Sequence, residues 1–434
     1  MLFSKGMIEE GRVLMAERRI AIIGGGAAGL AAAITAARRG ASVTILEHKD
    51  RVGKKILATG NGRCNYTNAV MHSGCFYAND TVVVEQLLKT YPTERILSFF
   101  EEIGVVPSER DGYYYPASGQ AAAVLDCLRA ECDRLGVDIR CETEVLAIQP
   151  VTGGFRIKTR PMENIKEDKR GGSISNLKVD RVLLCCGGQA SPVTGSDGSG
   201  YDLAFSLGHK IHTPFPALTG LKADPKRFKP LAGIRAKACA SLYVEGKAVK
   251  QEIGELQLTE NGLSGIVIFQ LSHPSIQAYL QKRKTEIHIN FLPEMQGDEV
   301  FPFLRQRRDM LGHKELQEWG VGLFHKKLWL QICKEAGLPL MMPASQLDNR
   351  GLSRLQAVIT DFTVPITGYL GYDRAQVTAG GVDLREITAN TFQSKKVPGL
   401  YFAGEILDVD GICGGYNLHF AWASGMAAAE AACR

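Results

Sequence analysis

Residues 19–47 read RIAIIGGGAAGLAAAITAARRGASVTILE, and this stretch decides the fold of the chain. An apolar run over 20–23 leads into the glycine-rich turn that begins at Gly24. An alanine-rich stretch follows, and a second apolar run ends at Glu47. This order predicts a strand, a G-x-G-x-x-G turn, a helix and a second strand, which is the order of a dinucleotide-binding βαβ unit. The alternative is a glycine-rich βα turn without a ligand.

The three glycines of the turn have separate tasks. Gly24 makes the tight turn, Gly26 lets the backbone approach a pyrophosphate, and Gly29 lets the helix pack closely on the strand. The helix N-terminus supplies free N–H groups and a positive dipole to phosphates. Glu47 lies 21 residues after Gly26, where a carboxylate accepts hydrogen bonds from ribose hydroxyls. Because a carboxylate repels a 2′-phosphate, FAD or NAD suits this site better than NADP.

Composition narrows the class of protein. A chain of 434 residues is long enough for two or three domains. The net charge of +5 is mild, and no basic stripe is interleaved with aromatic residues, so we expect a small-molecule substrate rather than nucleic acid. No uncharged apolar run reaches about 18 residues, so no membrane span is expected. The 11 cysteines form no C-x-x-C pair, which predicts neither a disulfide framework nor a metal site but buried thiols in a reduced cytoplasm.

The first seventeen residues differ from the rest of the chain. The nucleotide-binding pattern begins only at about Arg19, and Met15 stands just before it. Glu10-Gly11-Arg12 can be encoded by a purine-rich string, such as a bacterial ribosome-binding site. We therefore expect residues 1–17 to be a leader outside the fold, and translation to start at Met15 rather than at Met1 or Met7, so that residues 1–14 are not translated. A disordered tail is the alternative.

Hydrophobic periodicity outlines the remaining elements. Helices are expected over 82–103, 120–135, 298–340 and 416–431. Strands are expected over 137–148, 154–160, 181–186, 211–213, 238–245, 253–258, 285–291 and 374–379, and residues 161–178 read as a hairpin tip or connector. The block 195–372 lacks βαβ rhythm, so it is expected to form an inserted module.

Four motifs together resemble one known family. They are GGGAAG at 24–29, ATGNGRCNYTN at 58–68, GG followed by GSDGSG within 187–200, and AGEILDVDGICGGYNLHFAWASG at 403–425. The set is similar to that of the HI0933-like flavoproteins. The resemblance implies FAD and an α/β fold in three parts. A discontinuous Rossmann-type FAD-binding domain would cover 18–194 and 373–434. A β-barrel would be inserted at 195–372, with a small α-helical subdomain at about 296–345.

The same resemblance implies which residues contact FAD. The glycine turn, with Gly24 and the backbone of Gly26, Ala27, Ala28 and Gly29, would hold the pyrophosphate, and Glu47 the adenosine ribose. Val145 would bind adenine through its backbone, and Gly187 would pack on the cofactor. The residues implied near the phosphates and ring are Lys54, Lys55, Gly60, Asn61, Gly62 and Arg63, and those implied at the ribityl chain and ring are Gly404, Glu405, Asn417 and Leu418.

The last motif also favours FAD on physical grounds. A helix that begins at Gly415 or Tyr416 would direct its N–H groups to the N1–C2=O edge of a flavin, where reduction places negative charge. No second G-x-G-x-x-G unit follows a strand, so NAD(P)H, if it is the electron donor, binds only transiently.

Three functions remain open at this point. The first is reduction of a conjugated C=C bond in a 3-oxo-Δ4 or Δ4,6 steroid or bile-acid intermediate. The second is oxidation of a small amine such as aminoacetone by O2. The third is a non-enzymatic, redox-sensing flavoprotein. A steroid pocket would need apolar walls, and residues such as Phe215, Leu218, Ile266 and Phe269 can form either such walls or a core.

Candidate catalytic residues lie close to the implied ring position. We single out Arg63, Tyr115 and Tyr416. Arg63 could pair a substrate carbonyl or form a structural salt bridge. Further possible proton donors, each of which could instead be a packing residue, are Tyr113, Tyr114, Cys64, Cys413 and His419.

Overall fold

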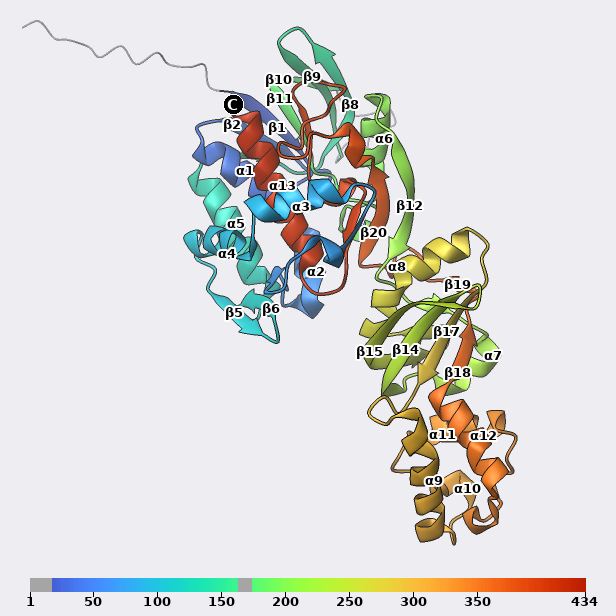
Figure 1. The fold of residues 1–434 in the computed structure, drawn as a ribbon. Helices are drawn as coiled ribbons and strands as arrows, with labels where there is room; N and C mark the ends of the chain where they lie inside the picture. Colours follow the sequence, from blue (N-terminus) through green and yellow to red (C-terminus); the bar gives the residue numbers. More distant parts are fainter. Residues whose placement is uncertain (1–17, 163–173) are drawn as a thin grey trace, which may run out of the picture.

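The computed structural model describes residues 18–162 and 174–434. The expected leader lies outside these residues, and so does most of the connector expected at 161–178. The described chain is elongated and has three parts in a row: a large α/β part, an antiparallel sheet and a cluster of helices (Figure 1).

A parallel five-stranded sheet forms the centre of the α/β part. Its strand order is β21-β11-β1-β2-β7, with β1 Arg19–Ile23, β2 Ser42–Leu46, β7 Asp138–Arg140, β11 Arg181–Leu184 and β21 Leu400–Phe402. After Arg19, β1 is a continuous apolar run, and Ile20, Ala21 and Ile22 are fully buried. This burial on both faces is typical of parallel strands covered on two sides.

The two covering layers differ in kind. One contains the helices α1 Ala27–Arg38, α5 Ala121–Arg134 and α13 Tyr416–Ala432, and α1 packs on α13 through small alanine side chains. The other is a three-stranded antiparallel sheet in the order β10-β9-β8, with β8 Thr143–Val151, β9 Gly154–Pro161 and β10 Ser175–Val179. The strand–turn–helix–strand unit predicted over 19–47 is therefore confirmed.

One predicted helix is divided in two. The residues 82–103 form α3 Thr81–Thr90 and α4 Thr93–Glu102, separated by Tyr91 and Pro92. The residue before a proline is pushed out of the helical region, which ends the first helix. The other short elements of this part are α2 Lys54–Ala58, β3 Thr67–Asn68, β4 Phe76–Ala78, β5 Pro107–Arg110, β6 Tyr113–Pro116, α6 Ser199–Ser206 and β22 Val409–Gly411.

The chain leaves this part along β12 Ile211–Ala217 and returns along β20 Val377–Val382, and the two strands pair antiparallel. Between them lies a seven-stranded antiparallel sheet in the order β18-β17-β14-β15-β16-β13-β19. Its strands are β13 Leu221–Lys222, β14 Arg235–Val244, β15 Lys247–Thr259, β16 Gly262–Ser264, β17 Thr285–Asn290, β18 Phe362–Pro365 and β19 Gly368–Tyr369. In the described residues no ladder joins β18 to β19. The sheet is therefore open, and the closed ladder of a barrel is not found.

Helix α8, Ile266–Leu280, packs across this sheet against β14, β15, β16, β17 and β19. The sequence pattern did not predict it, because it is apolar almost all round and contains Pro274. Beyond the sheet lie α9 Gly297–Leu311, α10 Leu316–Trp319 and α11 Lys326–Glu335, in the region 298–340 predicted to be helical, and then α12 Asn349–Thr360, which was not predicted. These helices share one hydrophobic core with the sheet, and it is separate from the core of the α/β part.

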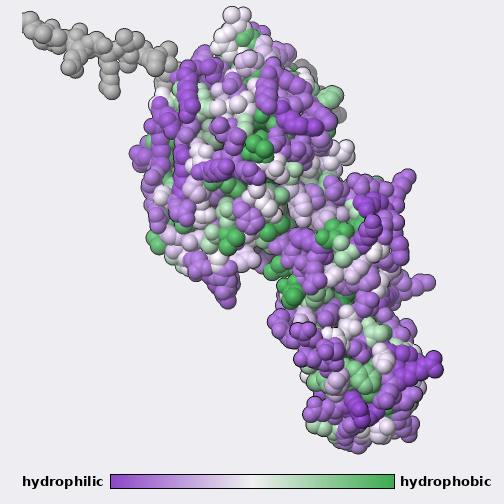
Figure 2. Space-filling model, in the orientation of Figure 1, coloured by the Kyte–Doolittle hydropathy of each residue, from purple (hydrophilic) through white to green (hydrophobic). Residues whose placement is uncertain are grey.

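No helix in the described residues is long and apolar enough to cross a membrane. The face shown in Figure 2 is mostly hydrophilic, and apolar side chains gather near the junction between the α/β part and the inserted sheet.

Candidate functional site

A cavity of about 1430 Å³ runs along the carboxyl edge of the parallel sheet and ends against the inserted module. Binding sites for one small molecule have volumes of about 300–1,000 Å³. The cavity therefore has room for more than one. Its lining comes from the glycine turn, the ends of β1, β2 and β11, the 53–65 segment, β6, the 373–377 loop and the start of α13.

The glycine turn forms one end of this cavity. Gly24 has a φ of 100°, and a Cβ on Gly29 would lie 2.0 Å from the carbonyl oxygen of Gly24. A Cβ on Gly26, in contrast, would meet no atom within 4 Å. Gly26, Ala27 and Ala28 line the cavity, and α1 begins at Ala27. The unpaired N–H groups at the start of α1 therefore border an open space that fits a phosphate.

Glu47 lies beside this turn at the end of β2. Its Oε2 accepts a hydrogen bond of 2.8 Å from the Gly25 N–H, and its Oε1 accepts one of 2.8 Å from the Lys49 N–H. The carboxylate is thus fixed by backbone donors and lines the cavity. Its remaining lone pairs can accept ribose hydroxyls, as an adenosine ribose requires.

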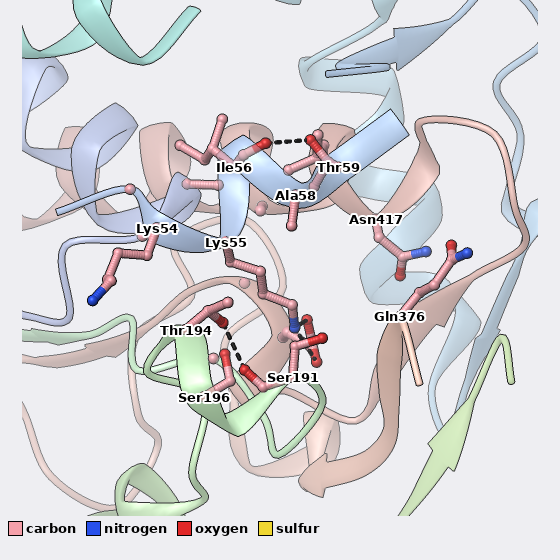
Figure 3. A pocket seen from close by; sticks show the side chains of 18 of the residues that line it. Lys54, Lys55, Ile56, Ala58, Thr59, Ser191, Thr194, Ser196, Gln376 and Asn417 are labelled. Carbon is pink, nitrogen blue, oxygen red and sulfur yellow. Dashed lines mark hydrogen bonds and ion pairs between the residues drawn. The ribbon is translucent and has the colours of Figure 1, made fainter. Parts of the chain in front are cut away.

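Two lysines on α2, Lys54 and Lys55, line the cavity (Figure 3). Their ion-pair partners differ. Lys55 Nζ lies 2.8 Å from Glu405 Oε2, and Glu405 Oε1 accepts a 3.0 Å hydrogen bond from Thr378 N. Lys54 Nζ lies 2.6 Å from Asp50 Oδ1. The Lys55–Glu405 ion pair joins α2 to the 404–406 turn, so these two residues fix the cavity wall as well as lining it.

The TGNGRC turn places some of its residues at the cavity and others away from it. Gly60 and Asn61 have left-handed backbones, with φ of 56° and 54°, and both line the cavity. Arg63 lines it too and is exposed, whereas Gly62 does not line it. Arg63 has no ion pair within the described residues, so the structural salt bridge considered for it is not found there. Cys64 is fully buried, and burial raises the pKa of its thiol to about 12.

The start of α13 forms the opposite wall. Gly414 and Gly415 have φ of 134° and 90°, and the helix begins at Tyr416. Asn417 and Leu418 line the cavity, and the Asn417 amide exchanges two 2.8 Å hydrogen bonds with the backbone of Gly411. Because the first N–H groups of a helix have no partner within it, this terminus can offer donors to a ligand.

The tyrosines on β6 alternate as a strand requires. Tyr113 and Tyr115 line the cavity, and Tyr114 packs against the core. The Tyr113 ring lies beside Gly414, since a Cβ there would be 3.0 Å from it, and Tyr115 lies beside Gly60. Burial raises the pKa of Tyr113, so its hydroxyl stays protonated at neutral pH.

Two other candidates lie outside the cavity lining. Tyr416 faces Phe76 in an edge-on contact with ring centroids 6.0 Å apart, because the first side chain of α13 turns towards β4. Its ring, like that of Tyr113, lies beside Gly414, which lines the cavity, so the catalytic role expected for Tyr416 stays a prediction. His419 is fully buried between Thr67 Oγ1 at 2.8 Å and the Tyr91 carbonyl at 3.0 Å. It is a packing residue.

Val145, Gly187 and Gly404 also line the cavity, as implied by the resemblance, whereas Gly29 supports the turn from behind. Leu218, Ile266 and Phe269 form an apolar wall on the insert side, and Phe215 packs in the module instead. Lining residues that the sequence pattern did not indicate include His48, Thr194, Ser196, Arg374 and Gln376. Ser196 belongs to the GSDGSG motif, whereas the other four lie outside the motifs, and only the fold brings them to this edge.

Comparison with known families identifies the family of the chain. A family model described as the HI0933-like protein Rossmann domain matches residues 18–431. The chain belongs to the HI0933-like family. The family is one of FAD-dependent oxidoreductases, and the glycine turn, Glu47 and the start of α13 fit that cofactor by their geometry.

Similar proteins in this family include enzymes of two named activities. A 3-dehydro-bile acid delta(4,6)-reductase of Clostridium scindens is 39% identical over 416 residues, covering 95% of this chain and 98% of that protein. A ribosomal RNA dihydrouridine synthase of Escherichia coli is 28% identical, covering 94% and 96%. Among solved structures, a 3-ketosteroid-delta4-(5alpha)-dehydrogenase of Rhodococcus jostii shares the fold, with a TM-score of 0.51, 15% identity and 98% of each chain covered.

Proposed function

We propose that this HI0933-like protein reduces the conjugated C=C bond of a 3-oxo-Δ4 or Δ4,6 steroid of the bile-acid type, with NAD(P)H as the electron donor. One observation carries the proposal. The cavity lining extends from the glycine turn to an apolar wall of Leu218, Ile266 and Phe269, and it includes Tyr113 and Tyr115. The full-length similarity to the Clostridium scindens reductase supports the same substrate class.

FAD, when bound, would supply the hydride for the β carbon of the enone. The residues of the chain supply the rest. Tyr113 Oη donates the proton that the α carbon needs, since a tyrosine hydroxyl is protonated at neutral pH and this ring lies beside Gly414 in the cavity lining. Arg63, which has no ion pair in the described part of the chain, donates hydrogen bonds to the 3-oxo group and stabilises the negative charge that develops there. The apolar wall excludes water from the steroid rings.

The E. coli relative brings in a second candidate, the C5=C6 bond of uracil in RNA, which is also conjugated to a carbonyl. Nucleic-acid sites are strongly positive. Here seven cationic and six anionic side chains line the cavity: Lys49, Arg51, Lys54, Lys55, Arg63, Arg110 and Arg374, against Glu47, Asp111, Glu144, Asp197, Asp373 and Glu405. This near balance favours a small, largely apolar substrate.

Anaerobic stopped-flow absorbance near 450 nm tests the proposal. NADH or NADPH should bleach the flavin of the purified protein, and a 3-oxo-Δ4 bile acid should restore the colour with formation of the saturated product. A uracil-containing RNA is tested in parallel. Reoxidation by the RNA but not by the steroid overturns the proposal in favour of the second candidate. Bleaching by aminoacetone alone, with colour returning in air, overturns it in favour of an amine oxidase.

The two tyrosines provide a matched pair for the protonation step. Tyr113→Phe should slow reoxidation by the enone about 10²-fold or more, because general-acid catalysis contributes roughly 10²–10⁴-fold. The rate of bleaching by NAD(P)H should not change. Tyr115→Phe removes the corresponding hydroxyl from the same face of β6. Its effect on the reoxidation rate should be smaller, because Tyr115 lies beside Gly60 rather than Gly414. Equal effects of the two changes would contradict the assignment to Tyr113.

A further inference from the structure

Helix α8 of the inserted module contacts the α/β part at two positions just before α13. Gln270 forms two hydrogen bonds with the backbone of Cys413: the Cys413 N–H donates to Oε1 at 2.9 Å, and Nε2 donates to the carbonyl oxygen at 3.4 Å. His273 Nδ1 lies 2.9 Å from Asp410 Oδ2. Both contacts reach the 410–413 segment, which leads directly into the Gly414–Gly415 turn at the start of α13.

The His273 contact is built from both parts of the molecule. Asp410 on β22 and Tyr77 on β4 are directly paired across two antiparallel strands, so their side chains share one face. The His273 ring stacks flat on Tyr77, with centroids 3.9 Å apart and planes 8° apart, while its Nδ1 meets Asp410. Asp410 is 2% exposed, and His273 is its only ion-pair partner in the described structure.

Pro274 leaves one backbone carbonyl oxygen of α8 free to bind a residue of another element. A proline has no N–H, so the carbonyl oxygen four residues earlier, that of Gln270, lacks its helical partner. Lys250 Nζ on β15 donates to this oxygen at 3.1 Å and lies 3.4 Å from Tyr77 Oη. The lysine therefore ties the sheet, α8 and β4 together at the residue whose side chain holds Cys413.

The same helix also lines the cavity. Ile266 and Phe269 lie one turn before Gln270 and His273 on α8, and both belong to the apolar wall. One rigid helix thus contacts the expected substrate on one turn and the Cys413 segment on the next.

We propose that α8 is a positioning element for the cofactor site: Gln270 and His273 hold the 410–413 segment so that the N-terminus of α13 faces the flavin. The proposal rests on the proposed function only in placing a flavin against that terminus. Gln270 and His273 are positioning residues, since they act through Cys413 and Asp410 rather than on the reacting atoms.

Release of bound FAD from the purified holoprotein tests this role. Release is followed after dilution by the recovery of flavin fluorescence, and the visible absorption band is recorded beforehand. Gln270→Ala should accelerate release about tenfold, because it removes the two hydrogen bonds between α8 and the backbone of Cys413. It should also change the shape of the visible band. Gln277→Ala is the matched control, because Gln277 is an exposed glutamine on the same helix.

His273 provides the second arm. His273→Leu should accelerate release to a similar extent, and His273→Asn, which keeps a donor near the position of Nδ1, should restore most of the wild-type rate. If His273→Leu does not fold, Gln270→Ala decides alone. Release rates and bands of Gln270→Ala that match those of the wild type, or an equal change in Gln277→Ala, overturn the proposal. Neither readout uses a steroid, so a failed enone assay leaves this test unaffected.

Discussion

The two ends of the cavity are built in opposite ways. At the nucleotide end, recognition comes from backbone: the glycine turn, two helix N-termini and a carboxylate that backbone N–H groups hold in place. At the insert end, the wall consists of side chains from three separate segments, Leu218, Ile266 with Phe269, and the 373–377 loop. A site made of backbone leaves a motif in the sequence, whereas a site made of side chains exists only once the separate segments have packed.

The largest expected effect is the loss of FAD binding at the nucleotide end in a protein that stays folded. Gly26→Val should abolish retention of FAD, with affinity lowered at least about a hundredfold by loss of the pyrophosphate contacts. The protein itself should stay folded, because a Cβ at this position meets no atom within 4 Å and the φ of −83° suits valine. Absorbance at 450 nm and thermal melting of the purified variant measure the two properties.

Gly29→Val is the control for that experiment. Its Cβ would lie 2.0 Å from the Gly24 carbonyl oxygen, so here the fold itself should fail. A colourless but stable Gly29→Val protein, or a yellow Gly26→Val protein, would contradict the separation of the two roles.

The next effect tests whether the insert is stabilised independently. Trp329 is fully buried, stacks on Phe324 at 6.2 Å and donates from Nε1 to the Leu316 carbonyl at 2.5 Å. Trp329→Ala should lower the free energy of unfolding of the inserted module by about 3–5 kcal/mol. FAD binding should be retained, because the two hydrophobic cores are separate.

Urea unfolding followed by tryptophan fluorescence checks this. In the variant, the fluorescence change from Trp319 in the module should occur at lower urea, while that from Trp422 in the α/β core should be little changed. Met341→Ala, at a residue 76% exposed in the same module, serves as the control. A parallel shift of both signals in Trp329→Ala would show that the two parts unfold together.

The smallest expected effect is a dependence of folding stability on pH that comes from the α/β core. Burial lowers the pKa of His419 to about 4 from an ordinary 6.5, so the folded protein holds this imidazole neutral. Between about pH 4 and pH 6.5, the unfolded chain therefore binds a proton at His419 that the folded protein does not bind. The stability is complete above about pH 6.5 and is lost as the pH falls towards 4, at a cost of up to about 3 kcal/mol.

Urea midpoints at about pH 7 and about pH 4.5 measure this dependence. His419→Gln keeps a donor for the Tyr91 carbonyl but cannot titrate, so its midpoints should differ less than those of the wild type. His313→Gln, at an exposed histidine, should leave the difference unchanged. An unchanged difference in His419→Gln would assign the acid sensitivity to other groups.

The sequence predicted the backbone-built features well. The strand–turn–helix unit, Glu47 at the end of its strand and a helix starting at Tyr416 are where their patterns placed them. These depend on local geometry, because only glycine tolerates the required close approaches and positive φ values. Pro92 was the local signal that could have divided the helix expected over 82–103.

The features that depend on side-chain packing could not be predicted from the local sequence. The direction of Tyr416 depends on how the first turn of α13 packs on β4, and no periodicity encodes that contact. Helix α8 was missed because Pro274 argues against a helix, and its cost is offset by Lys250, which lies 20 residues before Gln270 on another element. Both outcomes belong to tertiary packing.

The exit and return of the chain at β12 and β20 have a consequence for how such proteins diversify. Since the two strands pair directly, the module between them is attached to the α/β part as a loop is attached to a hairpin. Its core is complete without residues from the other part. Recombination at this ribbon therefore replaces the whole apolar wall in one step, provided that the new module again supplies the contacts of α8 to Asp410 and Cys413. The same ribbon marks the natural junction for chimaeras that exchange substrate range between members of the family.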